Sequence, residues 1–277
     1  GGWRYRSSDD PHTPWLSVII PAYNEAERLP GYLTEIRRLL DERQLGAEVL
    51  VVDDGSSDGT GDSVLSVAQQ DPRVMLLVQP QNAGKGKAIQ RGMLEARGHY
   101  LLFADADGAT PFREVLRLLE VAEVGHEIAI GSRRASSGDA TRKRAGLRAL
   151  MGQAFYAFVN FFAVPGISDT QCGFKLFRRD CARELFTGLN ESGWAFDVEV
   201  LYRAQLTGYG IAEVAVDWHE VDGSKVSPVR DAIRMFLAVF RIRRNNAGFL
   251  RRPADAGMDS RDYPADLSQP ERMQVSQ

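Results

Sequence analysis

The chain has 277 residues, of which 44% are hydrophobic and 26% charged, and its formal net charge is −3. This composition is ordinary for a soluble globular protein, and the length fits one large α/β domain or two small ones. The near-neutral charge gives no sign of a nucleic-acid partner. Two cysteines, Cys172 and Cys181, are too few for a disulfide framework and fit a reducing compartment.

Both ends of the chain are polar. Residues 1–15 (GGWRYRSSDDPHTPW) lack the apolar stretch of a signal peptide, and they lack an initiator Met, which leaves an upstream anchor open. No apolar run reaches the ~20 residues of a membrane span, because the longest one, 149–164, is interrupted by glycine and polar residues. Residues 253–277 are rich in Pro, Asp, Ser and Gln, and we expect this tail to be disordered.

Apolar strands alternate with helix patterns along the first half of the chain. After the first strand and Pro21, leucine and isoleucine recur at helical spacing. The strands are apolar at consecutive residues, which indicates a sheet covered on both faces, and the β-α-β-α order indicates parallel pairing. The expected strands are 16–20, 48–52, 74–78, 99–104 and 127–131, and the expected helices between them include 61–70, 85–96 and 112–124.

Polar segments follow the first four expected strands: PAYNE, DDGSSDGT, QNAGKGKA and DADG. In such sheets ligands bind beyond the carboxyl ends of the strands, so all four segments belong to one rim. In the last segment, Asp105 and Asp107 stand two residues apart at a strand end, where two unpaired carboxylates would repel each other. A hard divalent cation would resolve that conflict.

Each of these segments also has a simpler interpretation. DDGSSDGT is not an EF-hand loop, because Leu65 stands where a bidentate Glu is needed, but it suits a polar turn with Ser57 or Asp58 as a helix cap. NAGKGKA is neither a Walker A sequence nor a complete dinucleotide motif, although a glycine-rich turn that opens a helix still favours an anion. The pattern DADG alone fits a capped loop as well as it fits a metal site.

Taken in order, VIIPAYNE, VVDDGSSDGT, NAGKGKA and DADG resemble the family-2 glycosyltransferases with the GT-A fold. Four later segments are more specific: IGSRR, SDTQCGFKLF, WAFDVEVLY and EVDGSK look like the dolichyl-phosphate β-glucosyltransferase branch, with polyprenyl-phosphate mannosyltransferases as close relatives. The resemblance covers residues 16–226. It implies an α/β, Rossmann-like GT-A fold with a mostly parallel central sheet flanked by helices, followed by C-terminal amphipathic helices.

The resemblance also implies roles for residues on the rim. Asp105 and Asp107 match the metal-binding acids, with Asp107 favoured as the direct ligand, and a Mg²⁺ or Mn²⁺ ion there would bridge the donor diphosphate. Asp54 matches the acid that recognises the nucleoside base, with Asp53 in support, and DDGS favours UDP-glucose as the donor. The donor-binding residues implied are Pro21, Tyr23, Glu25, Asp53, Asp54, Lys85 and Asp105.

The second half is more basic and is expected to hold the acceptor. Six basic residues and one acid lie between Arg133 and Arg148, directly before the apolar run 149–164. Such runs are usually solvated loops, but arginines beside an apolar surface also suit a lipid phosphate. Family precedent places Asp169 and Gln171 on the acceptor side, and Lys225 is suited to assist a phosphate. The expected acceptor-phosphate residues are Arg133, Arg144, Arg148, Gln171 and Lys225.

Residues 227–252 are expected to form a basic amphipathic helix. Its arginines share a narrow stripe, with apolar residues beside them. Two interpretations stay open: a helix packed on the core, or an interfacial helix lying on anionic lipid. The stripe contains Arg230, Arg234, Arg241 and Arg244, and the apolar neighbours are Ile233, Phe236 and Phe240.

Five further residues have predicted environments. Cys172 is expected to be a small buried residue without a nucleophilic role. In the helix pattern WAFDVEVLYRA, Trp194 and Phe196 are expected to face a core. Asp197 and Glu199, which follow them, are either active-site acids or satisfied structural ones.

The expected organisation is a polar segment at 1–15, a GT-A domain at 16–226 with a donor half (16–131) and an acceptor half (132–226), the helix and the tail. The expected activity is an inverting, metal-dependent transfer of glucose from UDP-glucose to a polyprenyl phosphate, dolichyl or undecaprenyl. The protein would rest peripherally on the cytoplasmic face of a membrane, and its oligomeric state is left open. Its catalytic residues would be Asp105, Asp107 and Asp169.

Three alternatives to this activity remain. In the first, the donor is GDP-mannose or a UDP-N-acetylhexosamine instead of UDP-glucose. In the second, the acceptor is a sugar hydroxyl, and the reaction would need Asp169 or Asp197 as a general base. In the third, the protein binds nucleotide sugars without catalysing a transfer. The intact pair of Asp105 and Asp107 argues against this alternative.

Overall fold

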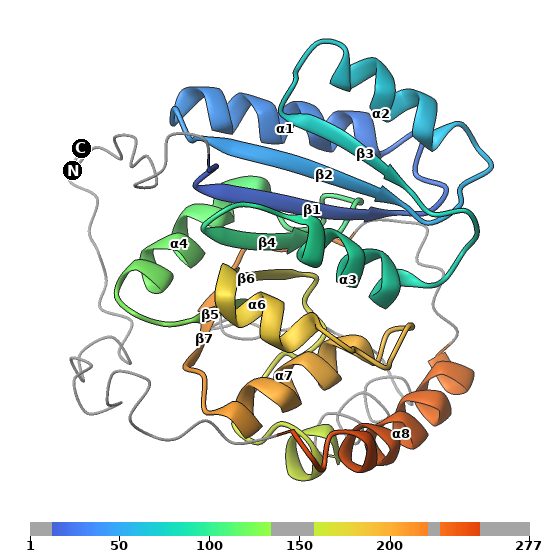
Figure 1. The fold of residues 1–277 in the computed structure, drawn as a ribbon, viewed down its shortest axis with the longest axis vertical. Coiled ribbons are helices and arrows are strands. Elements are labelled where there is room, and N and C mark those ends of the chain that lie inside the picture. Colours follow the sequence, from blue (N-terminus) through green and yellow to red (C-terminus); the bar gives the residue numbers. More distant parts are fainter. Residues whose placement is uncertain (1–12, 134–157, 221–227, 250–277) are drawn as a thin grey trace.

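A seven-stranded sheet forms the centre of the molecule in the computed structural model, which describes residues 13–133, 158–220 and 228–249 (Figure 1). The strand order is β3-β2-β1-β4-β6-β5-β7. The five strands expected from the sequence are present and begin or end within one or two residues of the predicted bounds. The strands are β1 (Leu16–Ala22), β2 (Ala47–Asp53), β3 (Val74–Val78), β4 (Tyr100–Ala104), β5 (Ile128–Ser132), β6 (Phe174–Arg178) and β7 (Ile211–Ala215).

Strand β6 is the one described strand that runs against the others. It pairs antiparallel with β4 on one side and with β5 on the other, whereas β1 pairs parallel with β2 and β4. Because β6 is reversed, its amino end lies at the carboxyl ends of its neighbours. The segment just before β6 therefore joins the same rim as the polar loops that follow β1, β2 and β4.

Helices cover both faces of the sheet, as the continuous apolar strands predicted. One face packs against α1, α2 and α4, and the other against α3, α6, α7 and part of α8. The helices are α1 (Leu29–Glu42), α2 (Thr60–Ala68), α3 (Lys85–Glu95), α4 (Val115–Glu123) with the short η1 (Phe112–Glu114) before it, α6 (Arg179–Phe186), α7 (Phe196–Thr207) and α8 (Pro228–Asn245).

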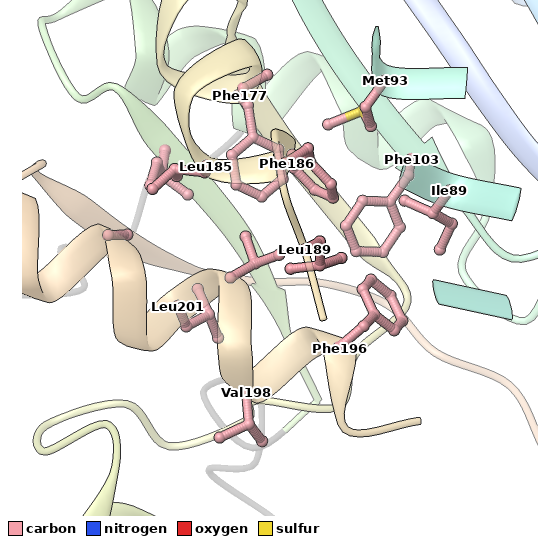
Figure 2. Close-up of a cluster of buried hydrophobic side chains, with 14 of the residues drawn as sticks. Ile89, Met93, Phe103, Phe177, Leu185, Phe186, Leu189, Phe196, Val198 and Leu201 are labelled. Carbon is pink, nitrogen blue, oxygen red and sulfur yellow. The ribbon is translucent and has the colours of Figure 1, made fainter. Parts of the chain in front are cut away.

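Aromatic side chains fill the core on the α3 and α7 side (Figure 2). Phe103 of β4 lies between Phe177 and Phe196, with ring centroids 6.1 and 5.7 Å apart, and all three are fully buried. Burying aromatic side chains of this size is the main favourable contribution to folding. The cluster ties β4, which ends just before Asp105, to the first turn of α7.

Local sequence signals account for the helix ends. Pro30 lies in the first turn of α1, where a missing N–H costs nothing. Helix α7 ends at Gly208, which adopts the left-handed conformation (φ 80°) that glycine tolerates best.

Helix α8 packs on the core and also exposes large apolar side chains. Ala238, Val239 and Ile242 are buried against the core, while Phe236 and Phe240 are about half exposed. The interpretation as a helix packed on the core therefore holds for one face of α8, while its contact with lipid stays a prediction for the exposed face. Among the described helices, none is both long and apolar enough to cross a bilayer.

One sequence expectation about the core is wrong. Phe196 is fully buried as predicted, but Trp194 is 43% exposed. The reason is that α7 begins only at Phe196, so Trp194 belongs to the preceding loop instead of to the helical face. Cys172 is buried as predicted.

Candidate active site

The loops after β1 and β2 interlock through polar side chains. Asn24, which has a positive φ of 55°, receives a hydrogen bond from the Ser57 amide at 2.9 Å and donates its own amide to the Ser56 hydroxyl. The Glu25 amide donates to Thr60 Oγ1 at 2.9 Å. The segments PAYNE and DDGSSDGT therefore form one rigid edge of the rim.

The expected donor residues on this edge differ in what their side chains contact. Tyr23 is 41% exposed, and Pro21 lies partly buried in β1. Glu25 forms a bidentate ion pair with Arg28, with Nε 2.8 Å from Oε2 and Nη2 2.7 Å from Oε1. Asp53 is buried and accepts the Ser56 amide, so it holds the turn.

Asp54 fixes the glycine-rich turn that leads into α3. Its buried carboxylate accepts hydrogen bonds from Gln79 Nε2 at 2.6 Å and from the amides of Ala83 and Gly84 at 2.7 and 2.9 Å. Three donors on one carboxylate satisfy its hydrogen bonding within the protein. Asp54 thus sets the position of Lys85, and its expected contact with a base stays a prediction.

Residues 191–196 pack against the other side of the same turn. The Gly86 amide donates to Ser192 O at 2.7 Å, and a β-carbon on Gly84 would lie 2.6 Å from that same oxygen. A β-carbon on Gly86 would lie 2.7 Å from Glu191 O and 2.8 Å from Phe196 Cβ. Only glycine at these two places permits so close an approach.

Lys85 and Asp105 meet at the centre of the rim. Lys85 Nζ lies 2.5 Å from Asp105 Oδ1 and 4.8 Å from the centroid of the Trp194 ring. Burial lowers the pKa of Lys85, but the surrounding carboxylates Asp105, Asp197 and Asp107 outweigh burial and hold its pKa above the ordinary value. Lys85 is therefore a cation at neutral pH.

The backbone at Gly173, just before β6, supports the Asp105 carboxylate. The Asp105 amide donates to Gly173 O at 3.0 Å, and a β-carbon on Gly173 would overlap the carboxylate of Asp105. The glycine of SDTQCGFKLF thus positions an acid that lies 68 residues earlier in the chain. This role was not visible in the sequence, because it follows from the reversed pairing of β6.

Asp107 closes the turn after β4. Its Oδ1 accepts the Ala109 amide at 3.0 Å, which leaves the other carboxylate oxygen outside this turn. Tyr32 packs beside Gly108, and its pKa is raised by burial and by Glu35, Asp105 and Asp107. Tyr32 therefore stays a neutral phenol beside the two acids.

The two acids fit a hard divalent cation that also binds donor phosphates. Asp105 Oδ1 is buried and has no hydrogen bond of acceptable geometry within the described residues, although the Lys85 ammonium neutralises it. Within the described ranges, no three His, Cys, Asp or Glu side chains are arranged to hold a metal ion. Mg²⁺ is commonly bound by one or two carboxylates with substrate phosphates completing the shell, which is the set that Asp105 and Asp107 provide.

Asp169 and Arg133, expected in separate roles, are partners. Arg133 binds the carboxylate with two prongs, Nε to Oδ2 at 2.7 Å and Nη2 to Oδ1 at 2.8 Å. Burial raises the pKa of Asp169, but the guanidinium outweighs burial and the pKa is lowered. The Asp169 carboxylate is therefore held ionised, and the guanidinium also lies 5.6 Å from the Trp218 ring.

A buried ion pair between Lys175 and Asp197 lies behind the rim. Lys175 Nζ is 2.6 Å from Asp197 Oδ1 and donates to Cys172 O at 2.6 Å, and both side chains are at most 2% exposed. Lys175 was not among the residues predicted from the sequence, although a lysine inside the apolar strand GFKLF was a usable signal. Burial raises the pKa of Asp197 despite its charged neighbours Lys175 and Lys85.

The remaining expected residues divide into structural ones and ones outside the described ranges. Glu199 is structural, because its buried carboxylate accepts from Asn190, Glu191, Arg203 and Asn246. Gln171 lies beside Asp169, to whose Oδ1 the backbone N–H of Gln171 donates at 3.3 Å. The predictions for Arg144, Arg148 and Lys225, and those for most of residues 1–15 and for the tail, lie outside the described residues.

Cys172 gives a direct test of burial at this rim. Burial and the Asp169 charge raise the pKa of its thiol to about 11, so the thiol stays protonated up to about pH 9 in the folded protein. Because only the thiolate reacts, we expect no alkylation of native protein by iodoacetamide at about pH 8, and full alkylation of both cysteines in denaturant. Mass spectrometry distinguishes the two states, and rapid labelling of Cys172 in folded protein would contradict the burial described.

Comparison with known families agrees with this geometry. Residues 17–186 match the model of "Glycosyl transferase family 2", and this range contains the four rim segments, Asp169 and Gly173. The chain belongs to glycosyl transferase family 2. It is a glycosyltransferase, and the expectation of a GT-A fold is confirmed by solved structures with the same arrangement of strands and helices.

Similar proteins from several eukaryotes share one name, dolichyl-phosphate beta-glucosyltransferase. The protein from Dictyostelium discoideum is 44% identical over 83% of this chain and 74% of its own length, and the protein from Homo sapiens is 41% identical over 82% and 74%. Among solved structures, mannosyl-3-phosphoglycerate synthase from Rubrobacter xylanophilus is 25% identical, with a TM-score of 0.61 over 91% of this chain and 80% of its own. The predicted branch of the family is thus confirmed.

Proposed function

We propose that the protein transfers glucose from UDP-glucose to a polyprenyl phosphate, dolichyl or undecaprenyl, at the cytoplasmic face of a membrane. The observation that carries the proposal is the cluster of Asp105, Asp107 and Lys85 at the strand ends, in a chain 41–44% identical to dolichyl-phosphate beta-glucosyltransferases. In this scheme a phosphate oxygen of the acceptor bonds to the anomeric carbon of glucose. The bond from that carbon to the diphosphate breaks, UDP leaves, and the configuration inverts.

The donor would lie across the rim formed by the loops after β1, β2, β3 and β4. Tyr23 and the turn held by Asp54 border the nucleoside end, and Lys85 supplies positive charge for the diphosphate. A Mg²⁺ or Mn²⁺ ion on Asp105 and Asp107 would neutralise charge on the leaving nucleotide. The chain itself contributes orientation, because the turns that carry these residues are fixed from both sides.

The carboxylates near the acceptor side favour a phosphate over a hydroxyl acceptor. A hydroxyl would need a general base, but Asp169 is occupied by Arg133 and Asp197 by Lys175. A phosphate monoester has a second pKa of about 6 and is largely dianionic at neutral pH, so it needs no base. Gln171 Nε2, which is buried and lacks a hydrogen-bond partner among the described residues, is a donor suited to a phosphate oxygen.

An aromatic patch supports contact with a membrane. We use this name for Phe158, Phe161 and Phe162 together with Phe236, Leu237 and Phe240 of α8. The rings touch one another, with Phe158 and Phe236 stacked at 4.1 Å, and Phe161 is 79% exposed. Arg243 borders the patch, because its Nη1 donates to Phe162 O at 2.7 Å, and Arg244 is exposed in the same last turn of α8. Apolar rings flanked by arginine are the composition of a surface that lies on anionic lipid.

The patch predicts a specific loss of membrane binding. Replacing Phe161 and Phe240 together by Ser should lower flotation with anionic vesicles severalfold, because exposed apolar area enters the lipid interface. Binding of the wild type should also fall with added salt, since part of the attraction is electrostatic. Leu65→Ser on α2, where Leu65 is 48% exposed, is the matched control. Flotation of the double variant at the wild-type level would contradict the proposed orientation.

The donor and acceptor are tested by one transfer assay. Radiolabelled UDP-glucose, GDP-mannose and UDP-N-acetylglucosamine are each incubated with polyprenyl phosphate, and label is counted in the organic phase. We expect label from UDP-glucose alone. Transfer from another donor would replace the sugar, and transfer only to an added sugar hydroxyl would replace the acceptor class.

A further inference from the structure

Trp194 is an exposed aromatic residue next to the central ion pair. It is 43% exposed, although Ala195 and Phe196, which follow it, are buried. One face of its indole is covered by the Lys85 ammonium, 4.8 Å from the ring centroid, and Lys85 Nζ in turn lies 2.5 Å from Asp105 Oδ1. The indole thus borders the place where the donor diphosphate is proposed to bind, while much of its surface stays open.

The loop that carries Trp194 is fixed from three sides. Glu199 of α7 accepts the amides of Asn190 and Glu191, at 3.1 and 2.7 Å. Arg241 of α8 binds the Glu191 carboxylate with two prongs at 3.1 and 3.0 Å, and Ser192 O accepts the Gly86 amide. A half-exposed aromatic ring on so constrained a loop is preorganised, which lowers the entropy cost of binding a ligand against it.

We propose that Trp194 forms one wall of the subsite that holds the transferred hexose, an inference that rests on the proposed nucleotide-sugar donor. A nucleotide sugar is ordered as nucleoside, two phosphates and hexose. The nucleoside end is proposed at the loops after β1 and β2, and the diphosphate at Lys85 and Asp105. The group that follows the diphosphate then meets the aromatic ring beside Lys85.

The chemistry of a hexose suits this ring. One face of a pyranose presents C–H groups, which pack well on an aromatic surface, while its hydroxyls point outward to polar groups. Sugar and cofactor sites commonly combine such an apolar wall with a few polar contacts. The Lys85 ammonium lies over one face of the indole, and this cation–π contact helps to hold the ring in place.

The test compares the affinity for a sugar nucleotide with that for the bare nucleotide, measured by calorimetry with Mg²⁺ or Mn²⁺ present. For Trp194→Leu we expect affinity for UDP-glucose to fall about tenfold and affinity for UDP to change less than about twofold. Trp194→Phe keeps an aromatic face and should recover much of the loss. Val124→Ala beside α4, where Val124 is 52% exposed, is a control for truncating an exposed apolar side chain.

Fluorescence provides a second readout. The chain has four tryptophans, Trp3, Trp15, Trp194 and Trp218. UDP-glucose should change the emission of the wild type more than UDP does, and this difference should disappear in Trp194→Phe. If the wild type transfers a different sugar, the same comparison with that donor still decides the role of Trp194. A wrong assignment of glucose can therefore be told apart from a wrong role for Trp194.

Three outcomes would overturn the inference. Equal loss of affinity for UDP and UDP-glucose would place Trp194 at the diphosphate, through Lys85. A rise in KM for polyprenyl phosphate with unchanged donor affinity would make the ring a wall for the acceptor. Unchanged binding of both donor forms in Trp194→Leu would mean that the exposed ring contacts no substrate.

Discussion

Asp107→Asn is expected to reduce transfer by about 10³-fold or more while leaving the fold intact. The amide oxygen of Asn can still accept the Ala109 amide, so the turn after β4 keeps its hydrogen bond. What the variant loses is the negative charge that is proposed to hold a divalent cation against the donor diphosphate, and such a cation would contribute several kcal/mol to stabilising the transition state. Thermal unfolding should stay within about 2 °C of the wild type.

Two comparisons make this result specific. Asp62→Asn removes an exposed carboxylate from the first turn of α2 and should leave activity unchanged. Chelation of divalent metal should abolish the transfer activity of the wild type, and added Mg²⁺ or Mn²⁺ should restore that activity. Full activity of Asp107→Asn, or of the wild type under chelation, would remove the metal from the proposal.

Gly173→Ala is expected to lower kcat by about 10²-fold, because the new β-carbon would occupy the space of the Asp105 carboxylate. Asp105 must then rotate or shift away, which separates it from Lys85 and from Asp107. Displacement of the strand end should also cost some thermal stability, so activity is measured well below the unfolding transition.

Gly193→Ala is the matched control for this change. A β-carbon on Gly193 meets no atom within 4 Å, although the residue lies in the loop beside Trp194. Its activity and unfolding temperature should stay close to those of the wild type. A Gly173→Ala protein with normal kcat would show that Asp105 is not held by this contact.

The sheet and its rim were predictable because their signals are local. Continuous apolar runs indicated the strands β1 to β5, and the rule for parallel sheets brought Asp54, Lys85 and Asp105 to one edge. The glycines at 84 and 86 also had a readable meaning, a turn opening a helix, although the partner backbone at Ser192 was not visible.

Other parts of the site depend on non-local pairing. The reversal of β6 brings Gly173 under Asp105, and no local pattern sets the direction of a strand that follows a long connection. The pairing of Asp169 with Arg133 likewise joins the loop before β6 to the residue that follows β5. Trp194 was misplaced because helical periodicity was extended two residues before the true start of α7.

The network around Glu199 makes α8 inseparable from the rest of the protein. Asn246 at the end of α8 donates to Glu199 and accepts from Arg203, and Arg203 also donates to the carbonyls of Leu185 and Thr187. A chain cut before α8 would leave Glu199 and Arg203 buried with unmet hydrogen bonds. A chimaera that exchanges this helix for another amphipathic helix would therefore need Asn246 and Arg241 in register, and a graft chosen for its hydrophobic face alone would disturb the loop that carries Trp194.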